Sequence, residues 1–508
     1  MGCASGSASD GAIDSTSDSA SVSANAGAPD FAVTTLAALL SSALLVLGGC
    51  ANPGAVHSTA VLLGATADAS STTPWPADRW WQAYGDSTLD RLVDQAIQGQ
   101  PGLQLTQARL RQAQAAVGGA EAPQQPQVNA AVDLTDQRFT ENGLVPPPLA
   151  GSVRWNNSGQ IGLSWELDLF GRQRAALASA IGQLRAAEAD TQAARVLLAG
   201  NVAAGYFNLA RLVAQRSVGT QSLQQREQVL ALVQQRVAAG LDTQVERRQA
   251  EGLIAQSRVE IEALEESIGR TRHALAELAG QRPDALDTLT PALATVRSTP
   301  LPAGLPADLL GRRADLVAQR WRVEAAQRDV DAARTLFYPN VNLSAFVGLS
   351  SIGLDKFLQA GSLTYGAGPA LRLPIFEGGR LRANLGAKAA EVDAAVDGYN
   401  SALLRALREV ADEIGSLQSL ERQQRAQADA STAANIAYDL ALQRYRAGLG
   451  NFLTVLTAQT NVLAQSRAST DLKARHLASE VALNRALGGG YATADLPSAP
   501  PAAAAATR

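Results

Sequence analysis

The side chains that most often carry catalysis are few in this 508-residue chain, and they stand apart from one another. The only histidines are His57, His273 and His476, and no His-Glu-x-x-His, Gly-x-Ser-x-Gly or phosphate-binding Walker motif occurs. Both cysteines, Cys3 and Cys50, precede the body of the chain, which therefore has no thiol for a disulfide framework or a zinc centre. The sequence predicts a protein that is not an enzyme and that needs no cofactor and no metal.

Cys50 is the one position with a recognisable chemistry, and that chemistry is lipidation. An apolar run over residues 31–49 ends in Leu-Gly-Gly directly before this cysteine. Small residues between an apolar segment and a cysteine resemble the lipobox of bacterial lipoproteins, in which the cysteine becomes the acylated first residue. A signal-anchor helix is the alternative, because about 20 apolar residues can span a bilayer. No Lys or Arg precedes Cys50, so the positively charged start of an ordinary signal peptide is missing.

The rest of the chain is an internal repeat with an offset of 208 residues. Gly171-Arg172 recurs as Gly379-Arg380, and residues 236–241 (Arg-Val-Ala-Ala-Gly-Leu) recur as residues 444–449 (Arg-Tyr-Arg-Ala-Gly-Leu). Each copy has two stretches that alternate apolar and polar residues, followed by a long run without proline that one glycine turn interrupts. Several matches in the same order indicate a duplicated unit.

The alternating stretches predict four strands, at about 127–136, 159–169, 340–350 and 363–374. Such strands could form half of a water-soluble sandwich, or the strands of a barrel with apolar side chains toward lipid and polar ones toward a lumen. Four strands cannot close a barrel, and open sheet edges are not tolerated in lipid. If these strands lie in a membrane, the chain must form an oligomer.

The runs without proline predict two helical hairpins, at 171–282 and 378–488. Apolar residues recur there at mixed spacings of three and four, and a continuous helix from Arg172 to Val237 would extend roughly 100 Å. Gly240 and Gly448 are the expected turns. A cytosolic coiled coil is the alternative, but it does not explain a lipobox and four amphipathic strands in the same chain.

Composition and pattern together predict the organisation of the chain. The net charge of −4 provides no electrostatic footprint for nucleic acid, and 5% aromatic residues are too few for large conventional cores. We expect a signal peptide with an extended N-terminus (1–49), a lipidated flexible linker (50–76), a first repeat (77–283), a linker (284–305), a second repeat (306–490) and a disordered tail (491–508).

Three sets of residues resemble a known family. They are Trp80-Trp81-x-x-Tyr84-Gly85-Asp86-Ser87, residues 312–318 (Arg-Arg-Ala-Asp-Leu-Val-Ala) followed by Phe-Tyr-Pro-Asn-Val at 337–341, and residues 444–449. Over about residues 76–490 the chain is similar to outer membrane factor lipoproteins of the NodT/OprM branch, which are related to TolC. The resemblance implies an α+β membrane protein and a homotrimer, in which four strands per protomer complete a 12-stranded outer-membrane β-barrel. Long coiled-coil hairpins continue that barrel as a periplasmic α-helical barrel.

The resemblance also implies a function and partners. Such proteins are passive outer-membrane exit ducts of tripartite pumps for drugs or other small solutes. A periplasmic adaptor joins them to an inner-membrane transporter of the RND or MFS type, and outer-membrane lipid surrounds them. We therefore expect a lipid-anchored protein of the bacterial outer membrane with a periplasmic helical tunnel. Two alternatives stay open: a type I secretion channel for polypeptides, and a periplasmic coiled-coil lipoprotein without a pore.

Candidate sites follow from the same resemblance. The hairpin tips are expected to dock the adaptor through Gly240, Leu241, Gly448 and Leu449. The family commonly has Leu-Asp-Ala-Gln-Arg after the second glycine turn, whose charges help to close the periplasmic aperture, whereas residues 456–460 here read Leu-Thr-Ala-Gln-Thr. We expect neutral hydrogen bonds to replace charge-assisted ones there. The expected aperture residues are Arg444, Tyr445, Leu453, Thr457 and Thr460.

Overall fold

The computed structural model describes residues 58–63, 76–298 and 313–491. The lipidation candidate Cys50 and the expected signal peptide lie outside these residues. In chain order the elements are η1 (Trp80–Tyr84), α2 (Ser87–Gly99), α3 (Pro101–Glu121), η2 (Ala122–Gln124), β1 (Gln127–Arg138), β2 (Val153–Leu167), α4 (Arg172–Ala238), α5 (Gln244–Leu278), η3 (Pro283–Leu286), α6 (Ala314–Thr335), β3 (Asn340–Ile352), η5 (Leu354–Lys356), η6 (Ala360–Ser362), β4 (Leu363–Arg372), α7 (Arg380–Arg446) and α8 (Phe452–Ala486).

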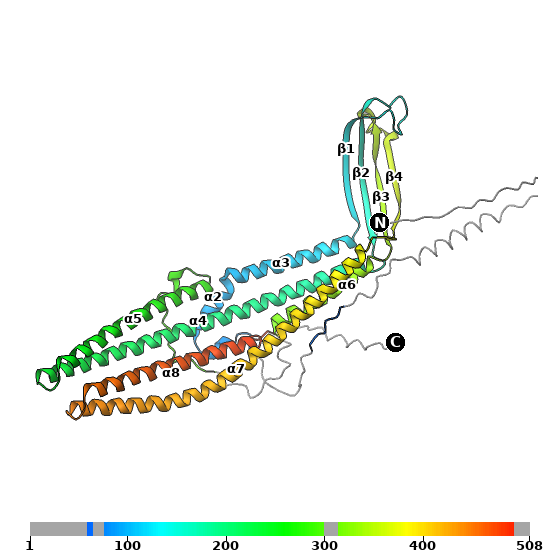
Figure 1. Cartoon of the computed structure of the whole chain (residues 1–508). Helices are drawn as coiled ribbons and strands as arrows, with labels where there is room; N and C mark the ends of the chain where they lie inside the picture. The colour runs from blue at the N-terminus through cyan, green and yellow to red at the C-terminus, as the bar shows by residue number, and fades with distance from the viewer. Residues whose placement is uncertain (1–57, 64–75, 299–312, 492–508) are drawn as a thin grey trace, which may run out of the picture. The chain divides into compact units, whose positions relative to one another are not determined.

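The four strands form one antiparallel sheet in the order β1-β2-β3-β4 (Figure 1). Each repeat supplies one adjacent pair, and β2 joins the two pairs by hydrogen bonding to β3. β2 begins at Val153, several residues before the alternating pattern at 159–169 suggests, because residues 156–158 (Asn-Asn-Ser) are polar on both faces. Strands β1 and β4 each pair on one side only, so the sheet has two open edges in the part of the chain that the structure describes.

The register of the sheet separates its two faces. Val128, Leu163, Ala345 and Ala367 form one cross-strand row, and Ile161, Val347 and Tyr365 belong to the same face. The opposite face carries mostly polar residues and glycines, among them Asn129, Gln160, Gly162, Ser164, Asn342, Ser344, Gly348, Thr364 and Gly368. Many of the large apolar side chains are exposed, including Val132 at 68% and Tyr365 at 76%. Among the described residues, no long helix packs against this apolar face.

The strands lead directly into the long helices. β2 ends at Leu167 because the next residue, Asp168, caps α4: its carboxylate accepts the backbone N–H groups of Gln173 and Arg174 at 3.1 and 3.0 Å. Gly171 adopts a left-handed conformation (φ 82°) in this corner, and Gly379 does the same (φ 84°) before α7. The repeated Gly-Arg pair therefore marks the same strand-to-helix corner in both copies.

Helix α4 is the central element of the helical part. It packs against α3, α5, α6 and α8, while α7 packs against α6 and α8 (Figure 1). α4 contains a stretch apolar enough to cross a membrane, but that stretch is 56% buried inside the chain, as expected for a helix at the centre of a bundle.

The Trp-Trp-x-x-Tyr-Gly-Asp motif anchors the start of the first repeat to α4. Trp80, Trp81 and Tyr84 are buried, and the Tyr84 ring meets Phe207 of α4 edge-on at 4.9 Å between centroids. Asp86 caps α2 through the Thr88 N–H and also accepts the Tyr206 hydroxyl at 2.6 Å. The motif is therefore a packing and capping device.

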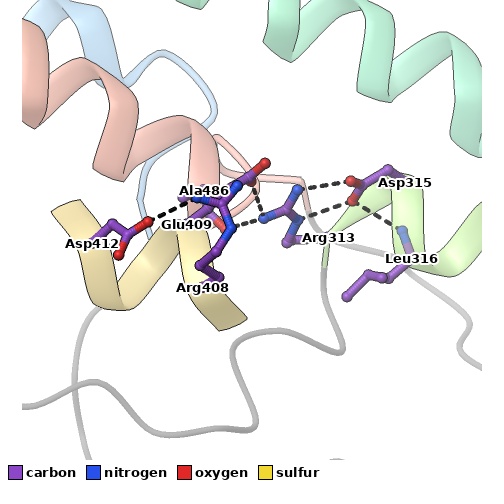
Figure 2. Close-up of polar contacts among 7 residues, drawn as sticks. All are labelled: Arg313, Asp315, Leu316, Arg408, Glu409, Asp412 and Ala486. Carbon is purple, nitrogen blue, oxygen red and sulfur yellow. Dashed lines mark hydrogen bonds and ion pairs between the residues drawn. The ribbon is translucent and has the colours of Figure 1, made fainter. Parts of the chain in front are cut away.

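Arg313 joins three helices at one point (Figure 2). This side chain is only 11% exposed. Its Nη1 donates to Glu409 of α7 at 3.0 Å and to the Ala486 carbonyl at the end of α8 at 3.1 Å. Its Nε and Nη2 donate to the Asp315 carboxylate, and Asp315 also accepts the Leu316 N–H. The second arginine of the Arg-Arg-Ala-Asp motif thus fixes α6 against α7 and α8.

We predict that Arg313→Ala lowers the thermal stability of the detergent-solubilised protein, because it leaves Glu409 and the Ala486 carbonyl without their donor. The expected loss is about 3 kcal/mol, the scale for breaking a buried ion pair from one side. Arg408→Ala is the control. The Arg408 and Asp412 side chains form an ion pair but are 66% and 58% exposed, so this pair is expected to contribute less than about 1 kcal/mol. Equal melting temperatures for the two variants by circular dichroism would contradict this role of Arg313.

Candidate functional site at the hairpin tips

Both helical hairpins turn through the same backbone motif. Gly240 and Gly448 have positive φ angles of 70° and 73°, which glycine adopts without strain. The N–H of Leu241 bonds to the Arg236 carbonyl at 2.9 Å, and the N–H of Leu449 bonds to the Arg444 carbonyl at 2.8 Å. These bonds close a Schellman turn at the end of α4 and of α7. The glycine and leucine of each repeated hexapeptide therefore form the tip itself.

The returning helices begin with different caps. Thr243 and Glu246 form a capping box at the start of α5, in which the Glu246 carboxylate accepts the Thr243 N–H at 2.9 Å. At the start of α8, the Asn451 side chain accepts the Thr454 N–H at 2.9 Å. Each tip is thus a short, well-capped turn between two long helices.

Three side chains, which we call the tip cluster, join the two hairpins near their tips: Arg236, Asp242 and Tyr445. Arg236 Nε donates to Asp242 Oδ2 at 2.9 Å, and Arg236 Nη1 donates to the Tyr445 backbone carbonyl at 3.0 Å. The Tyr445 hydroxyl donates to the same Asp242 oxygen. The guanidinium carbon lies 4.5 Å from the centre of the Tyr445 ring, within cation–π range. The cluster therefore connects the first hairpin to the second.

Burial and charge stabilise this cluster in one protonation state. Burial would raise the pKa of the Asp242 carboxyl, but hydrogen bonds from Arg236 and Tyr445 outweigh it and hold that pKa below its ordinary value. Burial, and then the Asp242 carboxylate, raise the pKa of the Tyr445 hydroxyl, which therefore stays a donor. The bond to Asp242 raises the pKa of the Arg236 guanidinium. At neutral pH the cluster is a charge-assisted network.

Apolar side chains support the cluster from behind. Tyr445 is fully buried, and its ring centre lies 6.2 Å from that of Phe452 on α8. Val233 of α4 and Val455 of α8 are also fully buried in the same group. The Tyr445 hydroxyl is therefore presented to Asp242 by a packed apolar layer that links α4, α7 and α8.

The structure separates the residues expected at the aperture. Tyr445 is buried between the hairpins, whereas the others are exposed: Arg444, Leu453, Thr457 and Thr460. The Thr457 and Thr460 hydroxyls bond to carbonyls of their own helix, Leu453 and Leu456, both at 2.9 Å. In the described part of this single chain these bonds stay within α8, and the neutral contacts expected at the aperture stay a prediction for the assembled duct. The expected docking residues Leu241 and Leu449 are 65% and 72% exposed at the tips.

The sequence pattern does not predict Arg236 and Asp242 as site residues. Asp242 lies two residues after Gly240, where the repeat offset of 208 places Gly450 in the second copy. Tyr445 likewise stands where the first copy has Val237. The sequence signal that indicates the tip cluster is therefore this difference between the two copies. The first hairpin has the carboxylate, and the second has the tyrosine that binds it.

Ser298, His476 and Glu480 meet elsewhere on the chain in a group that resembles a catalytic triad. The Ser298 hydroxyl lies 3.0 Å from His476 Nε2, and Glu480 lies 3.1 Å from the same nitrogen. The Ser298 hydroxyl also donates directly to Glu480. In a triad the carboxylate must orient the other ring nitrogen, and here Nδ1 is buried without a hydrogen-bond partner in the described part of the chain. The geometry does not suit nucleophilic catalysis.

Comparisons with known proteins agree with this architecture. Residues 92–281 and 305–489 match the family described as outer membrane efflux protein. The chain is 39% identical over 370 residues to the fusaric acid resistance protein FusA of Burkholderia cepacia. The aligned part is 70% of each of the two chains. It is 33% identical over 429 residues to the multidrug resistance outer membrane protein MdtP of Escherichia coli strain K12, which covers 83% of this chain and 88% of that protein.

Solved structures show the same fold. The outer membrane protein VceC of Vibrio cholerae superimposes with a TM-score of 0.77 at 35% identity, over 82% of this chain and 100% of that one. The open state of the MtrE outer membrane channel of Neisseria gonorrhoeae gives a TM-score of 0.73 at 26% identity, over 85% of this chain and 96% of that one.

We predict that the stabilising contribution of Asp242 depends on pH in one direction. Because its pKa is lowered by folding, the contribution is complete above the ordinary Asp pKa of about 3.9 and is lost as the pH falls through the lower folded value. At neutral pH Asp242→Asn should cost about 2 kcal/mol, the scale of hydrogen bonds to a charged group.

Thermal melts of wild type and Asp242→Asn should therefore differ fully at pH 7, begin to converge below about pH 4 and meet below the lowered folded pKa of Asp242. Asp439→Asn removes an exposed carboxylate from α7 and should match wild type throughout. A gap between wild type and Asp242→Asn that stays constant down to strongly acidic pH would contradict the assignment.

Proposed function

This chain belongs to the outer membrane efflux protein family, and from that premise we propose that three copies form the exit duct of a tripartite pump for drugs or other small solutes. Family membership confirms the resemblance drawn from the sequence, and the TolC-like fold class is confirmed as well. The protein is an outer-membrane efflux duct whose helices form a periplasmic tunnel. The trimer, the partners, the substrate class and the roles of single residues are the proposal.

The observation that carries this proposal is the two-faced sheet with open edges. An exposed apolar face suits lipid, and a polar face suits a water-filled lumen. Unpaired strand edges are not tolerated in lipid, so β1 of one copy must pair with β4 of the next. Three copies of four strands give 12, an even number in the range of closed outer-membrane barrels.

The length of β2 supports its position across a membrane. Trp155 and Trp165 lie on the apolar face, ten residues apart. At about 3.3 Å per residue they are roughly 33 Å apart along the strand, which becomes about 25 Å across the membrane when the strand tilts by about 40°. This matches the height of the apolar band between two aromatic girdles.

The hairpin tips are the proposed contacts of the partners. Leu241 and Leu449 are exposed apolar side chains at the ends of both hairpins, and such side chains suit docking of a periplasmic adaptor. The adaptor would connect the duct to an inner-membrane transporter of the RND or MFS type, which supplies the energy. The duct itself performs no chemistry, and acylation of Cys50 would add a lipid anchor.

The tip cluster is the proposed control of the periplasmic aperture. It links the hairpins of one chain through the Tyr445–Asp242 and Arg236–Asp242 contacts. In a ring of three chains, separating the hairpins of each chain would widen the tunnel at its end. Arg444, Leu453, Thr457 and Thr460 are exposed around this point and are the proposed lining or inter-chain residues.

Purified protein in planar bilayers should conduct ions, whereas a scaffold without a pore would not. Ile161→Arg places a charge on the apolar face midway along β2 and should reduce the assembled form, since it costs about 2–4 kcal/mol per chain at the bilayer midplane. Gln160→Arg adds the same charge on the polar face and should assemble and conduct with altered ion selectivity. The opposite pattern would contradict the assignment of the two faces.

Leu241→Asp together with Leu449→Asp should weaken binding of the protein's own adaptor by at least about tenfold, because a charge at each tip opposes apolar docking. Biolayer interferometry with the purified adaptor measures this loss, and bilayer conductance should be unchanged. Leu144→Asp alters a fully exposed leucine in the β1–β2 loop and serves as the control. Unchanged adaptor affinity in the double variant would remove the tips from the interface.

Tyr445→Phe keeps the ring but removes the hydroxyl that binds Asp242, so it should raise single-channel conductance or the time spent open. Tyr438→Phe removes the hydroxyl of a second tyrosine in the same apolar group that has no contact with Asp242, and it should conduct like wild type. If Tyr445→Phe also conducts like wild type, the tip cluster does not control the aperture.

A further inference from the structure

A cavity, which we call the corner cavity, lies where the sheet meets the long helices. The end of β2, the start of β3 and the end of β4 line it, together with the end of α6 and the starts of α4 and α7 (Figure 1). Its volume is about 240 Å³. This volume is near the lower end of the range for small-molecule sites, so the corner cavity suits a solute of one or two rings.

The sheet residues of the corner cavity belong to the polar face of the sheet. Glu166 on β2 pairs with Asn342 on that face, and Asn340 pairs with Arg372 two residues earlier along β3. Glu166, Asn340 and Arg372 all line the cavity. The corner cavity therefore lies on the side of the sheet that is proposed to enclose the lumen, where the barrel would continue into the helical tunnel.

Two stacked aromatic rings form part of the cavity wall. Phe170 follows β2 and Tyr338 follows α6, and their ring centres are 4.9 Å apart with an angle of 10° between the rings. The two residues are 45% and 48% exposed, because each ring covers only one side of the other. Aromatic rings favour offset-stacked and edge-on contacts with further rings. The pair can thus bind the ring of an aromatic solute.

One arginine of the corner cavity has a charge that no carboxylate balances. The three carboxylates that line the cavity are all paired with other arginines: Glu166 with Arg172 at 2.6 Å, Asp168 with Arg174 at 3.2 Å and Glu377 with Arg380 at 2.9 Å. Arg372 is exposed, and its side chain has no hydrogen bond or ion pair with any residue that the structure describes. A free guanidinium fork matches the two oxygens of a carboxylate.

Asn340 adds a polar group that a ligand could satisfy. Its Oδ1 atom is buried and has no hydrogen-bond partner within the described ranges of the chain. A buried acceptor without a donor is unfavourable, so a ligand hydroxyl or N–H group beside Asn340 would be stabilising. The corner cavity therefore combines aromatic faces, a free cation and an unpaired acceptor.

We propose that the corner cavity is a binding site in the duct for aromatic carboxylates, that is, small organic anions with one or two rings. The carboxylate binds Arg372, and the ring packs against Phe170 and Tyr338. This inference rests on the proposed duct, since it places the polar face of the sheet in a lumen, and it names a class of solute for that duct.

Three probes separate the contributions of charge and ring. 2-Naphthoate has both, 2-naphthalenemethanol lacks the charge, and cyclohexanecarboxylate lacks the aromatic ring. In isothermal titration calorimetry with purified full-length protein, 2-naphthoate should bind at least about tenfold more tightly than either of the others. Protein-free detergent is the blank. No binding of 2-naphthoate, or equal affinity for 2-naphthoate and 2-naphthalenemethanol, overturns the site.

Arg372→Gln should weaken 2-naphthoate binding by at least about tenfold, because it removes the charge that pairs with the carboxylate. Arg372→Lys keeps the charge without the planar fork, so its affinity should lie between those of wild type and Arg372→Gln. Arg382→Gln removes an exposed arginine of α7 that does not line the cavity, and it should bind like wild type. Equal losses for Arg372→Gln and Arg382→Gln would show only a general effect of charge and overturn the site.

Tyr338→Leu keeps an apolar side chain but removes a ring of the stacked pair. It should weaken 2-naphthoate binding roughly two- to tenfold and leave cyclohexanecarboxylate binding unchanged. Phe376→Leu is the control, because Phe376 is 89% exposed and does not line the cavity. Unchanged 2-naphthoate affinity in Tyr338→Leu, or an equal loss for both probes, overturns the aromatic part of the site.

Current recordings in planar bilayers separate this site from the duct itself. A solute bound in the lumen obstructs ion flow, so 2-naphthoate should cause brief current blocks in wild type. Arg372→Gln should need at least about tenfold more 2-naphthoate for the same effect. Conduction without 2-naphthoate binding overturns the site and leaves the duct. Binding without current blocks overturns the position of the site in the lumen, and binding by protein that never conducts overturns the duct together with that position.

Discussion

The two unpaired edges of the four-stranded sheet constrain the rest of this structure. A single sheet with one exposed apolar face and open β1 and β4 edges is unfavourable both in water and in lipid. Water would leave the apolar face uncovered, and lipid would leave the backbone N–H and C=O groups of both edges unpaired. Pairing each edge with another copy, inside a bilayer, removes both costs together. The tunnel function follows from this requirement, since closing the sheet also encloses the polar face.

The duplication explains how one chain prepares for this assembly. Each copy supplies a strand pair, a strand-to-helix corner and a helical hairpin. One chain therefore contributes two similar units to the wall of a larger tube. Arg313 ties the second copy together where α6, α7 and α8 meet. At the tips the copies differ, because Asp242 comes from the first and Tyr445 from the second. A contact between unlike copies can join the two hairpins of a chain, which identical copies could not do through this pair.

Much of this fold could be predicted from local pattern. Period-two alternation indicated the four strands, and the runs without proline together with Gly240 and Gly448 indicated the two hairpins. The start of β2 was missed because its polar residues do not alternate, although they pair with β1 and β3. The tip cluster could not be predicted from local pattern, because Asp242 and Tyr445 are 203 residues apart. Only the packing of α8 against both α4 and α7 brings them together. The hydrogen bonds of residues 58–63 (Ser-Thr-Ala-Val-Leu-Leu) to Asp393 could not be predicted either, because six residues are too few to show a periodic pattern.

The central claim is that β1 of one chain pairs with β4 of another until three chains close. Within one chain these strands are separated by two others, or about 14 Å, which is too far for a disulfide that needs Cα atoms within about 7 Å. Cysteines placed at Ala130 on β1 and, in turn, at Leu363, Tyr365, Ala367 and Leu371 on β4, with Cys3 and Cys50 replaced by alanine, would report this pairing on a denaturing gel. The account predicts that at least one pair yields a ladder ending at three covalently joined chains. No cross-linking at any position, or a ladder that continues past three, would contradict it.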